Sequence, residues 1–268
     1  MGFICQGVKV SDPLINLGSG LCRSAAEDVT KVMSQNLDSQ GLREALIECA
    51  RAMNRRGINV NKSGNVSVRA VSAEGEYGFL ITPTGVPYEV LTPEDIVWVP
   101  LSDPPSLDGA RGARLASSEW EMHARVLLAR PEMSAVVHTH SCHATALACQ
   151  GLAIPAFHYM VAAAGGKSID VVPYATFGTS RLAEAAAVGL ERKNACLLEH
   201  HGVLACGASL EKALNLAAEV ENLAHQYTVV RSLGEPKLID DEEMDRIAER
   251  FKTYGQPQPA ISEGGSHA

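Results

Sequence analysis

Two histidines at the end of an apolar run constrain the fold of this chain more than any other feature. Val136 and Val137 lead into His138-Thr139-His140, a pattern typical of a buried β-strand. Side chains alternate between the two faces of a strand, so His138 and His140 project from the same face. Two imidazoles on one rigid element indicate a metal site, and ordinary hydrogen bonding at a strand end is the alternative.

The charge and the cysteines limit the partners and the location of the chain. Its 268 residues carry 31 acidic and 23 basic side chains, which gives a formal charge of −8 without any run of Lys or Arg. This balance argues against a nucleic acid or a membrane surface as a partner. No apolar stretch reaches the roughly 18 residues of a membrane span. Seven cysteines without a C-x-x-C pair are typical of reduced thiols, so we expect a cytoplasmic protein.

Helical and strand-like segments alternate between two irregular ends. We expect residues 1–38 to form a weakly ordered extension, with Met33 as a candidate start, and residues 256–268 to form a disordered tail. Residues 39–255 predict a single α/β domain with a central mixed or antiparallel β-sheet flanked by helices. The predicted helices cover 42–53, 117–130, 144–150, 180–190, 210–233 and 241–254, and the predicted strands cover 65–69, 78–82, 96–99, 136–140, 169–172 and 195–198.

Three segments rich in hydrogen-bond donors are candidate anion sites. Ser117-Ser118-Glu119 stands at a predicted helix start, where it is either a simple N-cap or, with its free amide groups, a phosphate site. Gly64-Asn65-Val66-Ser67 and Thr82-Pro83-Thr84-Gly85 are tight turns with further donors, each a weak signal by itself. Gly165-Gly166-Lys167-Ser168 has the end of a nucleotide-binding loop, but Val161 replaces its first glycine, and we reject that interpretation.

A second pair of histidines, His200-His201, follows a strand-like segment. Either member would complete a three-histidine metal site with His138 and His140, and the spacing alone does not choose between them. We expect His123 and His143 to support the site or the fold rather than to bind a metal.

Together these motifs resemble the class II aldolase/adducin family. The resemblance rests on residues 64–69, 82–89, 117–120, 138–140 and 200–202. More narrowly, residues 154–160, 162–166, 173–179 and 251–255 are similar to the L-fuculose-1-phosphate aldolases within that family. The match runs in order from about residue 42 to residue 255.

The resemblance implies a metal site and a set of substrate residues. It implies one Zn²⁺ ion per subunit, bound by His138, His140 and His201, with Glu119 as a further ligand that leaves the ion to act as acid and base. It implies phosphate binding by Asn65, Thr84, Gly85, Ser117 and Ser118. It further implies that Tyr159 donates a proton in a neighbouring subunit's site, that Phe177, Phe251 and Tyr254 surround the substrate, and that the protein is a homotetramer with active sites between subunits.

The implied reaction acts on a sugar phosphate. A ketose 1-phosphate, L-fuculose 1-phosphate, is cleaved reversibly to dihydroxyacetone phosphate and L-lactaldehyde through a metal-stabilised enediolate. Three alternatives stay open: the same chemistry on 5-deoxyribulose or 5-methylthioribulose 1-phosphate, a pentulose-phosphate 4-epimerase, and a non-catalytic adducin-like interaction module. Lys62 stands in a turn where the family usually carries small residues, which leaves the natural substrate open.

Overall fold

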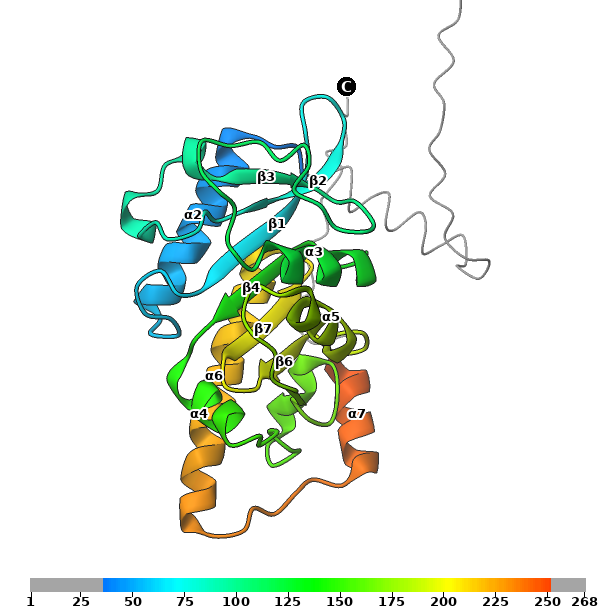
Figure 1. Ribbon diagram of the computed structural model, residues 1–268. Coiled ribbons are helices and arrows are strands. Elements are labelled where there is room, and N and C mark those ends of the chain that lie inside the picture. Colours follow the sequence, from blue (N-terminus) through cyan, green and yellow to red (C-terminus); the bar gives the residue numbers. More distant parts are fainter. Residues whose placement is uncertain (1–35, 252–268) are drawn as a thin grey trace, which may run out of the picture.

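The computed structural model describes residues 36–251, which form a seven-stranded mixed β-sheet flanked by helices (Figure 1). The strand order is β3-β2-β1-β4-β7-β6-β5, and every neighbouring pair is antiparallel except β5 and β6. This arrangement confirms the predicted fold class. The strands are β1 (Asn65–Val71), β2 (Tyr77–Ile81), β3 (Val97–Pro100), β4 (Ala135–Thr139), β5 (Val171–Val172), β6 (Ala195–Leu198) and β7 (Gly202–Gly207). The helices are α2 (Gln40–Arg55), α3 (Trp120–Ala129), α4 (Cys142–Cys149), α5 (Ser180–Gly189), α6 (Leu210–Leu233) and α7 (Asp241–Phe251), with short 3-10 turns η1 (Tyr88–Val90), η2 (Pro93–Asp95) and η3 (Tyr159–Ala164).

Alternating side chains give the sheet two buried faces. On β4, Val137 packs in the core with α2, α4 and α6, whereas Val136 packs in a second core with α3 and α5. The neighbouring strand β7 alternates in the same way, with Ala205 in the first core and Leu204 in the second. His138 has the same parity as Val136, so its side chain projects toward the α3 face.

Buried polar side chains of β1 hold α3 against the sheet. The guanidinium of Arg69 is buried and donates to the backbone carbonyls of Leu127 and Arg130 at the C-terminal end of α3, where a cation is also favoured by the helix dipole, and to that of Met133 just beyond it. Near the other end of the helix, Nδ1 of His123 lies 2.7 Å from the hydroxyl of Ser67. The helix is therefore fixed at two points. This also fixes the position of Glu119, the residue directly before the helix.

One element was misplaced by the sequence analysis and another was missed. The helix expected to begin at Ser117 begins at Trp120, because residues 117–119 form a turn in which the N–H of Trp120 donates to the carbonyl of Ser117. Strand β7 was not predicted, because it begins at Gly202 and all six of its residues are buried, which removes the alternation that marks a half-exposed strand.

Several further predictions concern residues at or beyond the ends of the described region. The candidate start Met33, the tail over 256–268 and the last residues of the helix predicted over 241–254 lie outside the described residues. Residues 36–38, which the sequence assigned to the extension, lie against the sheet, since Leu37 bridges to Val71 and Asp38 pairs with Arg43 at 2.7 Å. Within residues 36–251, no helix is long and apolar enough to span a membrane.

Candidate functional site

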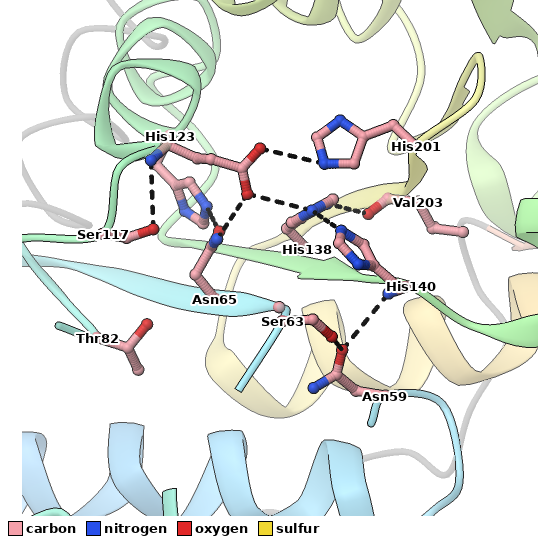
Figure 2. Close-up of polar contacts among 12 residues, drawn as sticks. Asn59, Ser63, Asn65, Thr82, Ser117, His123, His138, His140, His201 and Val203 are labelled. Atoms are coloured by element: carbon pink, nitrogen blue, oxygen red, sulfur yellow. Dashed lines mark hydrogen bonds and ion pairs between the residues drawn. The ribbon is translucent and has the colours of Figure 1, made fainter. Parts of the chain in front are cut away.

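Histidines from two parts of the sheet converge at the end of β4 (Figure 2). His138 lies in β4 and His140 follows its last residue. His201 comes from the short turn between β6 and β7. The structure thus brings His201, rather than His200, to the other two histidines. His200 has a left-handed backbone with a φ of 54° and is exposed.

The ligand atoms of this cluster have the spacing of a metal site. The Nε2 atoms of His138 and His140 are 3.0 Å apart, and the ligand atoms of all three histidines lie within 4.8 Å of one another. The Glu119 carboxylate places Oε2 3.3 Å from Nε2 of His138 and Oε1 3.2 Å from Nε2 of His201. A tetrahedral zinc site with Zn–N distances of about 2.0–2.1 Å separates its ligand atoms by about 3.3 Å. The three pair distances of 3.0, 3.2 and 3.3 Å lie near this value, so the histidines and Glu119 could hold one small divalent cation.

The hydrogen bonding of His138 directs a lone pair into the cluster. Nδ1 donates to the backbone carbonyl of Val203 at 2.9 Å, so the neutral ring carries its lone pair on Nε2. Burial lowers the pKa of His138 to about 4, and burial also holds the pKa of His140 below its ordinary value. Both rings are consequently neutral at pH 7, which is the form that binds a metal.

Glu119 is 6% exposed and carries its negative charge into this buried cluster. Burial by itself raises the pKa of the Glu119 carboxyl, but the polar contacts with His201 and Asn65 lower that pKa well below its usual range. Oε2 accepts a hydrogen bond from Nδ2 of Asn65 at 2.9 Å. Oε1 is buried without an aligned hydrogen-bond donor, and a cation among the histidines would satisfy it.

Two glycines allow other segments to approach the histidine strand. A Cβ atom on Gly202 would lie 2.3 Å from the carbonyl oxygen of Thr139 and 2.9 Å from Cδ2 of His140. A Cβ atom on Gly64 would lie 2.3 Å from the carbonyl oxygen of His138. These positions require glycine because backbone atoms occupy the space of a side chain.

A buried chain of hydrogen bonds lies behind Glu119 (Figure 2). Asn65 sits opposite His138 in the β1–β4 register, and its Oδ1 lies 2.5 Å from Nε2 of His123. His123 in turn contacts Ser67 through Nδ1. The sequence predicted a supporting role for His123, and the structure joins it to Glu119 through a single residue, Asn65.

The burial of His123 predicts an acid-sensitive fold. Burial lowers its pKa from the ordinary 6.5 to about 3, so at intermediate pH the unfolded chain binds a proton that the folded chain excludes. Stability is therefore lost as the pH falls below 6.5, and His123 contributes about 1.4 kcal/mol of that loss between pH 7.5 and 5.5. Urea unfolding of the metal-free protein should show a smaller loss over this range for His123→Gln than for the wild type. Equal losses would contradict the prediction.

A cavity of about 340 Å³ opens onto the histidine cluster. Two predicted substrate residues, Ser118 and Phe177, line it, and Phe177 is 66% exposed. The sequence did not predict Ser63 or Tyr174 as site residues, because nothing set them apart in the motifs that contain or border them. The full lining is Ser63, Ser118, Glu119, His140, Tyr174, Ala175, Phe177, His200 and His201.

The other residues expected to bind phosphate do not line this cavity, namely Asn65, Thr84, Gly85 and Ser117. Ser117 is buried, and its Oγ accepts from the N–H of Glu119 at 3.3 Å. Thr84 and Gly85 are exposed in a turn whose Thr84 N–H donates to the carbonyl of Leu115. Nζ of Lys62 donates to the carbonyl of Gly85 at 2.8 Å, which places a cation on this turn.

The remaining predicted residues do not line this cavity. Tyr159 lies in η3, is 50% exposed and packs its ring against His158. Phe251 lies at the end of α7, beside a different cavity that Met160 also lines. Tyr254 lies outside the described residues. Tyr159 and Phe251 nevertheless belong to one side of the subunit, because α7 packs against η3.

Comparisons with known proteins identify the family of this chain. The family model described as "Class II Aldolase and Adducin N-terminal domain" matches residues 44–228. The chain is 48% identical to a 5-methylthioribulose-1-phosphate/5-deoxyribulose-1-phosphate aldolase of Rhodospirillum rubrum, over 80% of this chain and 92% of that protein. It is 44% identical to the L-fuculose phosphate aldolase of Escherichia coli K12, over 82% of this chain and 98% of that protein.

Solved structures give the same result for the fold. An L-fuculose 1-phosphate aldolase superposes with a TM-score of 0.74 at 37% sequence identity, over 80% of this chain and 97% of that one. The family model matches more than half of the chain, and together with relatives of this identity and coverage it confirms the resemblance drawn from the motifs. The chain is a member of the class II aldolase and adducin family.

Proposed function

We propose that this protein is a zinc-dependent aldolase that cleaves a ketose 1-phosphate, with L-fuculose 1-phosphate as the leading substrate. The observation that carries the proposal is the position of Glu119, whose carboxylate oxygens lie 3.2 and 3.3 Å from His201 and His138 beside an open cavity. An acid or base next to three clustered imidazoles suits a reaction in which a proton is transferred and a carbon–carbon bond is broken at one centre. A non-catalytic interaction module would not need an acid or base beside three clustered histidines.

His138, His140 and His201 would hold the ion, with Glu119 as a ligand before substrate arrives. When bound, the ion supplies Lewis acidity that stabilises negative charge on the dihydroxyacetone phosphate fragment, a contribution of several kcal/mol. Glu119 returns a proton to C3 of that fragment in cleavage and removes it in synthesis. Glu119 is 6% exposed and lines the cavity, so its carboxylate can reach a bound substrate while little of it contacts solvent.

The phosphate group is proposed to bind at the turns beside the cavity. Ser118 and Ser63 line the cavity, and Lys62, the neighbour of Ser63 in the chain, contacts the exposed turn that contains Thr84 and Gly85. Ser117 and Asn65 complete the proposed set. Lys62 on the carbonyl of Gly85 would add positive charge there, which matters because the net charge of −8 does not attract a phosphate dianion.

We further propose a homotetramer in which Tyr159 completes the site of a neighbouring subunit. In its own subunit Tyr159 is half exposed and outside the cavity, so it needs a second subunit in order to reach a substrate. Phe251 and Tyr254 would accompany it, since α7 packs on η3. Tyr159 would then exchange the proton of the C4 hydroxyl, while Phe177 contacts the aldehyde end from within the subunit. A cytoplasmic location remains our prediction.

The tetramer predicts complementation between two inactive variants. Tyr159→Phe removes the proton donor and should slow turnover while zinc content stays at the wild-type level. Glu119→Gln removes the acid and base from the other half of the site. Mixed tetramers formed by unfolding and refolding the two variants together should recover part of the wild-type rate, because some sites contain both intact residues. No recovery, with mixed tetramers demonstrated by a tag, would contradict the shared site.

A second candidate substrate class has a specific observation in its favour. The Rhodospirillum rubrum relative, 48% identical, is named for 5-methylthioribulose 1-phosphate and 5-deoxyribulose 1-phosphate. These substrates carry the same dihydroxyacetone phosphate half, so the proposed machinery serves them equally. They differ only at the aldehyde end, where Tyr174 and Phe177 would contact them.

A substrate panel tests the function and ranks the candidates. The zinc-loaded protein is assayed with L-fuculose 1-phosphate, 5-deoxyribulose 1-phosphate and 5-methylthioribulose 1-phosphate, and dihydroxyacetone phosphate release is measured. We expect release from at least one of them, and the largest kcat/KM identifies the substrate. Isomerisation of a pentulose phosphate without any release would favour an epimerase instead. Zinc-loaded protein that is inert on every compound would overturn the proposal.

A further inference from the structure

Among the described histidines outside the triad, His123 alone is fully buried. It lies on the face of α3 that packs against β1, and both of its ring nitrogens have partners. The proposed reaction gives it no task, since it touches neither the cavity nor the ligand atoms. Because His123 contacts Asn65, and Asn65 donates to Glu119, His123 can act on Glu119 indirectly.

The directions of these hydrogen bonds follow from Glu119. An ionised carboxylate only accepts hydrogen bonds, so Asn65 must present its NH2 group to Oε2 and its Oδ1 to His123. Nε2 of His123 must then donate, which leaves Nδ1 to accept from the hydroxyl of Ser67. Burial lowers the pKa of His123 to about 3, and the ring therefore keeps a single proton at neutral pH.

We propose that His123 is a positioning residue that acts on Glu119 through Asn65. The proton on Nε2 holds the Asn65 amide in one of its two orientations, the one that offers Nδ2 to the carboxylate. In the opposite orientation Oδ1 would face Oε2, and two acceptors at hydrogen-bond distance repel each other. Glu119 would then be pushed away from His138 and His201. This inference rests on the proposed function for the role of Glu119 as metal ligand and acid and base.

Two substitutions of His123 separate its two hydrogen bonds. A glutamine reaches the position of Nε2 and can donate to Asn65, whereas an asparagine reaches only the position of Nδ1 and keeps the Ser67 contact. Partners that orient metal ligands typically change metal affinity or activity by about 10- to 100-fold when removed. His123→Asn should therefore weaken zinc binding by about 10- to 100-fold, and His123→Gln should restore most of the affinity.

The first measurement is zinc affinity, determined by competition with a chromophoric chelator in the absence of any substrate. The second is the kinetic split on the ketose 1-phosphate that the panel identifies, where we expect kcat to fall in His123→Asn while KM stays within a few-fold. A residue that only stabilises the fold would affect both variants alike. Equal affinities for the two variants, or a larger loss in His123→Gln, would overturn the inference.

A double-mutant cycle with Asn65→Ala keeps the inference testable if His123→Asn folds poorly. His123 acts through Asn65, so replacing His123 should no longer change zinc affinity once Asn65 is gone. Additive losses in the folded double variant would overturn the inference. Wild-type protein that cleaves no sugar phosphate, together with the expected difference in zinc affinity, would refute the proposed function and leave the positioning role of His123 intact.

Discussion

Removal of divalent metal should lower the cleavage rate of the ketose 1-phosphate by at least about 10³-fold, and added zinc should restore it. The size follows from the several kcal/mol that a Lewis acid contributes to a developing charge, at 1.36 kcal/mol for each factor of ten. His138 already directs its Nε2 lone pair into the cluster, so the metal-free site should reload without refolding. The measurement is dihydroxyacetone phosphate release after chelation and after titration with one equivalent of zinc.

The adjacent histidines offer a matched control for this result. His201→Asn should abolish stoichiometric zinc binding, because His201 is one of the three clustered imidazoles. His200→Asn changes the neighbouring residue in the same way and should leave zinc binding intact, and asparagine tolerates the left-handed backbone at that position. Full activity after chelation, or zinc loss from His200→Asn alone, would contradict the assignment.

The second large effect is expected from Gly202→Ala. The new Cβ would be forced against the carbonyl oxygen of Thr139 at 2.3 Å and against the ring of His140 at 2.9 Å. Neither the β4–β7 ladder nor the ring can yield without disturbing the site, so we expect a destabilisation of about 1–3 kcal/mol, at least tenfold weaker zinc binding and loss of most activity. Urea unfolding and zinc titration measure the two effects separately.

Gly41→Ala is the matched control for this substitution. Gly41 lies in the first turn of α2, where an added Cβ would have nothing within 4 Å, and alanine favours a helix over glycine by roughly 0.5–1 kcal/mol. The control should therefore be as stable as the wild type or more stable, with unchanged zinc binding. A Gly202→Ala protein that matched it in both measurements would show that the backbone approach at Gly202 is not required.

Local patterns were enough to predict much of this fold. The helix predicted over 210–233 matches α6, and the strand predicted over 195–198 matches β6, because each has its own apolar period and clear ends. Strand β7 escaped prediction because a fully buried central strand has no alternating pattern and begins at a glycine. The start of α3 was misplaced because a serine-rich turn looks like an N-cap.

The site shows the same division between local and long-range information. Strand parity placed His138 and His140 on one face, but the choice of His201 over His200 depends on the left-handed turn at His200 and on the pairing of β6 with β7. The contact between Asn65 and Glu119 joins residues 54 positions apart and depends on how α3 lies on β1. No pattern within either segment contains that information.

The histidine cluster and the aromatic wall of the cavity differ in how freely they can vary. His138 lies in the paired strand β4 and His140 follows its last residue, whereas Tyr174 and Phe177 lie on an irregular segment whose Tyr174 N–H donates to the Glu199 carboxylate at 2.7 Å. Substitutions in that segment disturb no ladder of backbone hydrogen bonds. Under the proposed function, a lineage of such proteins can accordingly come to accept new aldehydes by exchanging a few aromatic side chains, while the metal ligands and Glu119 are inherited unchanged.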